Sequence, residues 1–295
     1  MSHRLARQMQ QEAVAVKQSC RVLGVSRSGY YAARRRLARP AAADGAAAHA
    51  QAAFEAAGRC YGSRRLAAAL RERGVPMGRH RVRRLMRENG LRPAWRRKFV
   101  HTTDSRHSLP VFENVLNRQF DPAEPNRAWA ADITYVRTRG GWLYLAAVLD
   151  LFSRKVVGWA AAPAMPASLV CDALRMALGQ RRPPPGLIVH SDRGSHYASQ
   201  EHRDLLARHG LTGSMSRKGN CWDNAVMERF FLNLKQERLW RRDYANHAEA
   251  EKDITDYIVG FYNSRRLHSK LGNLPPNVYE RNTAAGQPIS VSIKT

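Results

Sequence analysis

Apolar and polar residues follow three successive patterns along this chain of 295 residues. Up to about residue 91, apolar residues recur at helical spacing in short segments that turns separate. From Trp129 to Ala161 they are spaced as in strands, and strand-length apolar runs then alternate with helix-length segments. A run of strands followed by alternating helices and strands is typical of an α/β layer fold. The pattern therefore predicts small helical modules ahead of an α/β core.

The first helical module is predicted over residues 19–36. A short helix, a turn at Gly24-Val25-Ser26 and a second helix follow one another, and Ser26 is expected to cap the second helix. This arrangement is compatible with a small helix-turn-helix fragment.

The second helical module, residues 61–91, gives a stronger signal. Ser63 is expected to cap its first helix, residues 74–76 break that helix, and a second helix is expected over 79–89. One face of the second helix is apolar and the other is basic, with Val82, Leu85 and Met86 opposite His80, Arg84 and Arg87. A helix, a turn and a basic helix form the layout of a DNA reader, so we predict that the three basic-face residues contact DNA. The alternative is a solvated, charged helix face.

The core is predicted to begin with three antiparallel strands and to continue with helices and strands in alternation. The strands are expected at about 129–136, 142–149, 155–160, 187–191 and 211–216, and the helices at about 168–179, 199–209 and 224–241. The predicted fold class is thus α/β, with small all-α modules in front.

The charge of the chain favours a nucleic-acid partner. The sequence has 49 Lys and Arg against 24 Asp and Glu, a net charge of +25, and residues 1–100 alone hold 23 basic and 5 acidic residues. A basic block of this kind is the electrostatic footprint of a nucleic-acid binder, and arginine suits bidentate contacts to phosphate. A GC-rich coding sequence would also enrich arginine, so the charge alone does not decide.

The sequence predicts neither a membrane segment nor a zinc site. No apolar stretch approaches the roughly 18 residues of a membrane span, and the N-terminus lacks a signal-peptide core. We therefore expect a soluble, cytoplasmic protein without a membrane partner. The spacing of the cysteines argues against structural zinc and disulfides, since no two of Cys20, Cys60, Cys171 and Cys221 form a C-x-x-C pair.

Three carboxylates are candidates for a metal site. Asp132 interrupts the apolar strand WAADITYV, and Asp192 ends the strand LIVHS. A buried carboxylate is costly without a cation or hydrogen bonds, and strand ends in α/β folds point into ligand crevices. Glu228 is expected in the second turn of the long helix. Carboxylates suit Mg²⁺, and two such ions could activate an attacking oxygen and stabilise a leaving one.

The start of the long helix carries further candidates. Asp223 is expected to be the N-cap, with Trp222 and Met227 packed as a hydrophobic staple. Asn224 and Lys235 are expected to share the face of Glu228, so both could touch nucleic acid beside the metal ligand.

The order of strand Asp, strand-end Asp and helix Glu resembles the DDE transposase and retroviral-integrase superfamily. Between Asp192 and Glu228 lie 35 residues, which is that superfamily's D-x35-E spacing. Longer segments resemble the second-frame (OrfB) product of the bacterial insertion sequence 3 family across nearly the whole chain. These segments are CRVLGVSRSGYY, YGSRRL, HRVRRLMRENGL, WAADITYV, LDLFSRKVVGW, HSDRGSHY, KGNCWDNAVMERFF, LKQE and YNSRRLHSKLGNLPPNVY. The set is highly specific, whereas the spacing alone is not.

The resemblance implies a ribonuclease-H-like mixed sheet flanked by helices, in which Asp132, Asp192 and Glu228 hold two Mg²⁺ (or Mn²⁺) ions. It implies hydrolysis at a DNA 3′ end, followed by strand transfer through attack of the freed 3′-OH. It further implies binding to double-stranded DNA, both terminal inverted repeats and target, by a homo-oligomer. An upstream first-frame transposase product is the implied partner, often through a frameshift fusion. Lys235 matches the family's basic residue that touches terminal DNA.

Other polar residues near the motifs have plainer interpretations. Asp150 also ends a strand, and a turn cap is its preferred role. His190 and His196 could contact DNA or a ligand residue, but the implied chemistry needs no histidine base. Lys218 could contact phosphate or be a solvated loop residue, and Trp222 could stack on an unpaired base instead of forming the staple.

We expect the chain to divide into five segments, and we consider three functions. The segments are a helical segment at 1–42, a helix-turn-helix-like DNA-binding module at 43–100, a basic linker at 101–122, an integrase-type catalytic core at 123–245 and a helical, basic extension at 246–295. The expected function is DNA cutting and joining by a transposase. A catalytically inactive, transposase-derived repressor and a nuclease that only hydrolyses are the alternatives.

Overall fold

The first three helices form a unit of their own. The computed structural model describes residues 2–12, 14–38, 45–93 and 109–286, and the chain divides into the units Met1–His49 and Ala50–Thr295. The first unit contains α1 (Ser2–Gln11), α2 (Val16–Val22) and α3 (Arg27–Ala38). Ala6, Cys20 and Tyr30 form its buried core.

The predicted turn and cap of this first unit are confirmed. Gly24 follows α2 with a positive φ, a backbone conformation that glycine adopts without steric cost. The Ser26 hydroxyl accepts a hydrogen bond from the Gly29 amide at the start of α3. The sequence patterns do not indicate α1, which packs against both later helices.

The second helical module comprises α4 (Ala46–Ala56), α5 (Ser63–Glu72) and α6 (Arg79–Glu88). Leu66 and Leu70 of α5 and Val82 and Met86 of α6 are buried, as the spacing predicts. The predicted Ser63 cap is wrong. Gly62 is the N-cap residue, Ser63 is the first residue inside the helix, and no side chain caps it.

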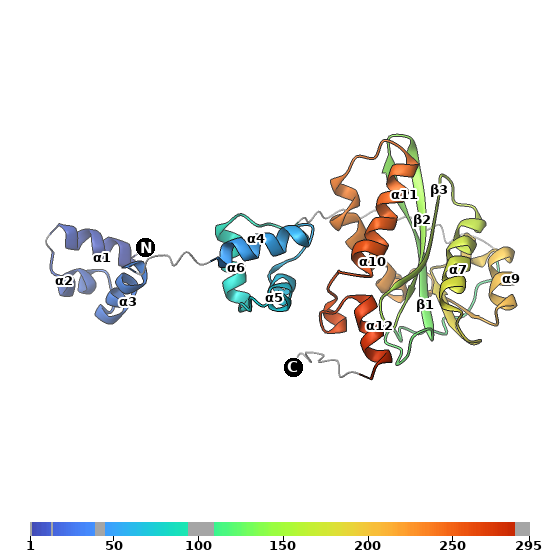
Figure 1. Ribbon diagram of the computed structural model, residues 1–295, viewed down its shortest axis with the longest axis horizontal. Coiled ribbons are helices and arrows are strands. Elements are labelled where there is room, and N and C mark those ends of the chain that lie inside the picture. The colour runs from blue at the N-terminus through green and yellow to red at the C-terminus, as the bar shows by residue number, and fades with distance from the viewer. Residues whose placement is uncertain (1, 13, 39–44, 94–108, 287–295) are drawn as a thin grey trace. The chain divides into compact units, whose positions relative to one another are not determined.

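A five-stranded mixed sheet forms the centre of the second unit (Figure 1). The strands are β1 (Ala128–Thr138), β2 (Gly141–Asp150), β3 (Val156–Ala162), β4 (Ile188–Ser191) and β5 (Thr212–Met215), in the spatial order β3-β2-β1-β4-β5. The first three strands pair antiparallel, whereas β4 pairs parallel with both β1 and β5. The predicted α/β class and mixed sheet are confirmed.

Helices cover both faces of this sheet (Figure 1). On one face lie α7 (Ala167–Arg181) and α9 (Gln200–Arg208), with the one-turn helix α8 (Ser195–Ala198) between β4 and α9. On the other face lie α10 (Ala225–Glu237), the short 3₁₀ segment η2 (Leu239–Arg241) and α11 (His247–Thr255). Each face has its own apolar core, because alternate side chains of a strand point to opposite sides.

The long helix predicted over 224–241 is shorter in the structure. A 3₁₀ turn, η1 (Cys221–Asn224), precedes α10, and the helix ends where Arg238 leaves the helical region with a φ of −133°. The apolar residues beyond that point belong to η2, where Leu239 is buried in the same core. The periodicity thus identified the right face but joined two elements into one.

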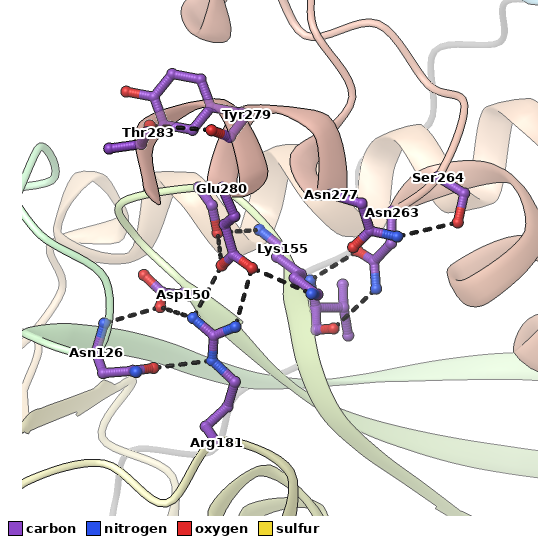
Figure 2. A network of polar contacts seen from close by, with 12 residues as sticks. Asn126, Asp150, Lys155, Arg181, Asn263, Ser264, Asn277, Tyr279, Glu280 and Thr283 are labelled. Carbon is purple, nitrogen blue, oxygen red and sulfur yellow. Dashed lines mark hydrogen bonds and ion pairs between the residues drawn. The ribbon is translucent and has the colours of Figure 1, made fainter. Parts of the chain in front are cut away.

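The C-terminal segment packs back onto the core. The π-helix η3 (Asp256–Tyr262) continues from α11, and the 3₁₀ turn η4 (Ser269–Leu271) and α12 (Pro276–Ala284) follow. Figure 2 shows how Lys155 and Arg181 donate hydrogen bonds to the carboxylate of Glu280 in α12. The Ser153 hydroxyl donates a further one. Arg181 also pairs with Asp150, so one guanidinium joins α7, the end of β2 and α12.

Asp150 has the structural role that the sequence favours. Its carboxylate is fully buried and accepts a hydrogen bond from the Asn126 amide at 2.9 Å (Figure 2). It accepts a second one from the Phe152 amide, also at 2.9 Å. The bond to Phe152, two residues ahead, is the predicted turn cap. Asp150 therefore takes no part in the candidate site.

The predicted basic linker, residues 101–122, lies partly outside the described residues, because residues 94–108 are not described. Residues 109–127 form an irregular segment ahead of β1. None of the described helices combines the length and apolar character that a membrane span requires.

Candidate active site

The register of β1 and β4 makes two aspartates neighbours. Ala130 pairs with His190 in the parallel ladder, and Asp132 and Asp192 each follow two residues later. Adjacent strands lie about 4.8 Å apart, so both residues continue the same level of the sheet. The sequence predicted each strand but not this pairing, which brings residues 60 positions apart side by side.

Both aspartates are oriented by bonds to their own backbone. Asp132 Oδ1 accepts a hydrogen bond from the Ile133 amide at 2.8 Å, and Asp192 Oδ1 accepts one from the Gly194 amide at 2.9 Å. A Cβ atom at position 194 would lie 3.0 Å from Asp192 Oδ1, so this tight turn favours glycine.

Glu228 lies on α10, which covers the sheet face opposite to α7 and α9. It lies in the first turn of α10, not in the second as predicted, because α10 begins at Ala225. Asn224 is the N-cap residue, is buried, and donates from Nδ2 to the Ala131 carbonyl at 3.3 Å. This bond connects the start of α10 to the residue before Asp132. Glu228 lies one helical turn further along α10 from this contact with β1.

Asp223 is not the N-cap of α10, which corrects the prediction. Its fully buried carboxylate accepts hydrogen bonds from the Arg217 amide and guanidinium and from Asn114, and pairs with Arg118 at 2.7 Å. These bonds, those from Arg217 first, hold the pKa of Asp223 far below its ordinary value. Asp223 thus joins the loop before α10 to the segment ahead of β1.

The predicted hydrophobic staple is also wrong. Met227 is fully buried in the α10 core, whereas Trp222 is 70% exposed. The 3₁₀ turn places Trp222 outside the core, where its indole is free to meet another molecule. The base-stacking alternative for Trp222 therefore stays a prediction.

The three acidic side chains influence one another. Burial raises the pKa of Asp132 well above its ordinary value, and the negative charges of Asp192 and then Glu228 raise it further. The positive charge of Lys235 and the Ile133 amide act in the opposite direction. This combination identifies a place where negative charge accumulates and a cation would be stabilised.

The acids do not stand in a finished metal-binding geometry. Across residues 2–12, 14–38, 45–93 and 109–286, no three Asp, Glu, His or Cys side chains lie close enough to share an ion. The Glu228 side chain is exposed on α10. The chemistry of the donors nevertheless fits a hard cation, because all three supply carboxylate oxygens.

Lys235 lies at the edge of this site. Its ammonium is 4.5 Å from the centroid of the Tyr135 ring, a cation–π contact. Burial lowers the pKa of Lys235, and the charge of Asp132 opposes that shift. The sequence reasoning singled out Lys235 but missed Tyr135, because its ring looked like an ordinary strand residue.

The predicted DNA-contact residues differ in exposure. His80, Arg84 and Arg87 are exposed on α6, and Lys218 is exposed in the loop before α10. Asn224 is buried, and Lys235 is half-buried. The exposed residues are open to a partner, whereas Asn224 reaches one only from within the site.

The histidines of the HSDRGSH segment have different environments. His190 is fully buried between the hydroxyls of Ser214 and Ser216, and burial lowers its pKa to about 4. It is therefore a neutral core residue and not a DNA contact. His196 is half-buried, and burial lowers its pKa against the opposing charge of Asp192.

The families that match the chain agree with this layout. Residues 42–99 match the HTH-like domain, and residues 122–221 and 209–276 match two descriptions of the integrase core domain. The chain therefore combines an HTH-like domain with an integrase core domain.

Curated relatives match almost their whole length. The chain is 45% identical over 262 residues to the insertion element IS600 uncharacterized 31 kDa protein of Shigella sonnei, covering 88% of this chain and 96% of that protein. It is 42% identical over 275 residues to the transposase InsF for insertion sequence IS3A of Escherichia coli K12, covering 92% and 96%. The chain belongs to the IS3 family of insertion-sequence transposases.

Solved structures are more distant. The HTLV-2 integrase catalytic core domain in complex with magnesium is 17% identical, with a TM-score of 0.43, and the match covers 54% of this chain and 98% of that one.

Proposed function

We propose that this transposase is a metal-dependent polynucleotidyl transferase whose ligand residues are Asp132, Asp192 and Glu228. The observation that carries the proposal is that the charges of Asp192, at the end of β4, and of Glu228, in the first turn of α10, both act on Asp132 of β1. Two Mg²⁺ (or Mn²⁺) ions, when bound, would supply Lewis acidity to the attacking and leaving oxygens. The three carboxylates would orient the DNA end by holding that charge in place.

The proposed reactions are two successive displacements at phosphorus. In the first, a water oxygen bonds to phosphorus at the element's 3′ end, and the bond from phosphorus to the 3′ oxygen breaks. The element strand then ends in a free 3′-OH. In the second, that 3′ oxygen bonds to a target phosphorus, the target's own 3′ oxygen leaves, and one phosphodiester replaces another.

The remaining polar residues would position the DNA. Lys235, held over Tyr135, would contact the terminal phosphates, while Asn224 would approach the DNA end from the start of α10. Lys218 and Trp222, exposed in the preceding loop and turn, would meet phosphate and an unpaired base. His80, Arg84 and Arg87 of α6 would read the terminal repeats.

The expected partners follow from this chemistry. Two DNA ends must be paired for transposition, so a homo-oligomer would assemble on the terminal repeats before target DNA is captured. A first-frame product, separate or fused, would supply further DNA binding. The domain boundaries at residues 42, 100, 122 and 245 remain part of the same proposal.

A cleavage and joining assay tests the proposal. The full chain, Glu228→Gln and Glu251→Gln are incubated with DNA that carries the element's ends and with target DNA, in Mg²⁺ and in EDTA. Glu251, exposed on α11, is the matched control. We expect nicking and joining in Mg²⁺ with the wild type and Glu251→Gln, and a loss of at least about 100-fold in Glu228→Gln. Its DNA binding should remain.

Other outcomes would contradict the proposal in different ways. DNA binding without cleavage, even with the first-frame product added, would indicate an inactive, DNA-binding repressor. Cleavage without any joined product would indicate a nuclease. Cleavage that persists in EDTA or in Glu228→Gln would remove the metal and the glutamate from the mechanism.

A further inference from the structure

Two aromatic rings contact each other on neighbouring strands of the sheet. Tyr135 of β1 and Trp142 of β2 stand edge to face, with their ring centroids 5.1 Å apart and their planes at 86°. Trp142 is 47% exposed, and Tyr135 is half-buried. A single exposed apolar residue needs no explanation, but an aromatic pair in which one ring is nearly half exposed is a candidate contact surface.

Both rings lie on the sheet face that carries α7 and α9. Ile133 of β1 and Tyr144 of β2 pack against the apolar core on that face. Each of the two contacting rings lies two positions along its strand from one of these residues, so it points to the same side. Arg137 lies directly opposite Trp142 in the β1–β2 ladder and is exposed. The aromatic pair therefore has a basic neighbour on its own face.

A second cation meets the pair at the free edge of β1. The ladder between β1 and β4 covers only Ala128–Ala130, whereas the ladder with β2 continues to Thr138, so β1 is the edge strand at the level of Tyr135. Lys235 lies on α10, which covers the other face of the sheet, and its ammonium is 4.5 Å from the centroid of the Tyr135 ring. This contact therefore passes around the edge of the sheet.

The same edge adjoins the candidate active site. Asp132 lies three residues before Tyr135, about 10 Å along the strand, and alternation turns its side chain toward α10. Lys235 lies about two helical turns after Glu228 on the same helix. A DNA strand whose phosphate meets Lys235 would thus have the candidate ligands on one side of the edge and the aromatic pair on the other.

The charge around the pair favours nucleic acid over a second copy of this chain. Lys235 and Arg137 flank the rings, and the whole chain has a net charge of +25. A contact between two copies through this surface would bring the cations of one copy against those of the other, which like charges oppose. A DNA strand would instead be held by both cations, because its phosphates are negative.

We propose that Tyr135 and Trp142 form a stacking platform for unpaired bases at the DNA end that this transposase cuts, with Lys235 and Arg137 as flanking phosphate contacts. The inference rests on the proposed function and adds a site for the DNA strand beside the cut. Aromatic rings set among cations are the arrangement by which proteins hold single-stranded nucleic acid, since every base has a flat face to stack. A base inside a duplex already stacks on its neighbours, so the platform selects unpaired ones.

DNA binding measured by fluorescence anisotropy in EDTA tests the platform without cleavage. The probes are a duplex with the element's terminal sequence and the same duplex with mismatched terminal base pairs. We expect Trp142→Leu, which keeps an apolar side chain but has no ring, to weaken binding to the mismatched end about 10-fold. Its affinity for the paired duplex should stay unchanged, because base pairing there competes with stacking. Trp142→Tyr should restore binding to the mismatched end.

The flanking cation has its own test and control. Arg137→Gln should weaken binding to both probes and reduce the slope of log Kd against log salt concentration by about one. Arg139→Gln is the matched control, because this arginine of the same hairpin is already paired with Asp243 at 2.7 Å. It should change neither affinity. Circular dichroism before each titration verifies that the variant is folded.

Equal losses on both probes, or the same loss in Trp142→Tyr as in Trp142→Leu, would overturn the inference alone. So would a Trp142→Leu variant that binds both probes like the wild type but self-associates less in sedimentation, because the surface would then hold a second copy of the chain. A wild type that binds the mismatched end through Trp142 and yet cuts no DNA in Mg²⁺ would contradict the proposed function, and the platform would stand.

Discussion

At the scale of single residues, Asp223 shows how a buried charge can hold two segments of the chain together. Its carboxylate is buried and holds Arg118 and Arg217 from two different segments, each through a charge-assisted hydrogen bond. Such bonds are roughly twice as strong as hydrogen bonds between neutral groups. Removing the Asp223 carboxylate would leave both guanidinium groups without their anionic partner. The loop that carries Lys218 and Trp222 therefore depends on Asp223 for its position.

We predict that Asp223→Asn lowers the free energy of unfolding by about 1–3 kcal/mol, because an amide cannot satisfy two guanidinium groups. Urea unfolding at pH 7 in EDTA measures this difference. Asp243→Asn is the control, since Asp243 pairs with Arg139 at the exposed surface and its change should not be resolved. Equal midpoints for wild type and Asp223→Asn would show that the pairs contribute nothing.

The candidate acids show how far residue-level reasoning reaches. Asp132 could be singled out because a carboxylate inside an apolar strand departs from the local pattern, and Asp192 because it ends a strand. Glu228 was singled out by its spacing of 35 residues from Asp192. Asp223 was misassigned because an Asp before a helix looks like a cap whatever it actually binds. Its true partners include Arg118, which is 105 positions away and invisible to local rules.

At the scale of elements, the packing of α7 on β3 requires a residue without a side chain. A Cβ atom at Gly158 would lie 2.2 Å from the Ala173 carbonyl oxygen and 2.7 Å from the Ala177 nitrogen. Both atoms belong to the helix backbone, which cannot give way as a flexible side chain would. The close approach of α7 to β3 at this point therefore requires glycine at position 158.

We predict that Gly158→Ala destabilises the core by about 3 kcal/mol or more, because α7 must move away from β3 along its length. Thermal unfolding followed by circular dichroism measures the effect. Gly179→Ala is the matched control: this glycine lies in α7, its added Cβ meets nothing within 4 Å, and alanine favours helix. An unchanged melting temperature in Gly158→Ala would mean that the close approach is not maintained in solution.

The elements themselves were largely predictable, and their ends were not. Strands β1, β2 and β3 could be placed to within a few residues because their apolar residues and the Arg139-Gly140-Gly141 hairpin turn lie close in sequence. The end of α10 at Glu237 could not, since the apolar pattern continues through Leu239 and only the backbone changes direction. The spacing of apolar residues identifies which face of a helix is buried. It does not reveal a break in the helix backbone when the residues on both sides of the break bury the same face.

At the scale of the whole second unit, one buried ion pair joins three parts of the chain. Arg266 is fully buried and pairs at 2.6 Å with Glu237, the last residue of α10, which also accepts from Tyr257. Arg65 of α5 lies 3.9 Å from the same carboxylate. A pair of this kind is costly to bury and is stable only because its hydrogen bonds are satisfied.

The same region ties the helix-turn-helix-like module to the core. The Tyr61 hydroxyl accepts from the Leu267 amide at 2.8 Å and donates to the Arg265 carbonyl at 3.3 Å. The module that contains α6 is therefore connected to the segment between η3 and η4, and through Arg65 to the end of α10. No sequence rule joins Tyr61 to Leu267 across 206 positions, so this connection belongs to the structure alone.

Buried neutral histidines make the stability of this unit depend on pH. Burial lowers the pKa of His202 and of His190 to about 4, and burial together with the charge of Arg266 lowers the pKa of His268 well below its ordinary value. The unfolded chain binds a proton at His190 and His202 near pH 6.5, whereas the folded chain does not bind these protons until about pH 4. Their stabilising contribution is thus complete above about pH 6.5 and is lost as the pH falls toward 4.

We predict that the free energy of unfolding falls between pH 6.5 and pH 4.5, by up to about 1.4 kcal/mol per pH unit for each such histidine. His202→Gln should unfold more easily than the wild type at pH 7.5, and the difference should narrow toward pH 4.5 because glutamine does not titrate. Urea unfolding in EDTA at several pH values measures both slopes, and His209→Gln is the control because His209 is exposed near the end of the same helix. His209→Gln should follow the wild-type slope; a His202→Gln curve parallel to the wild type would show that the protonation of His202 is not linked to unfolding.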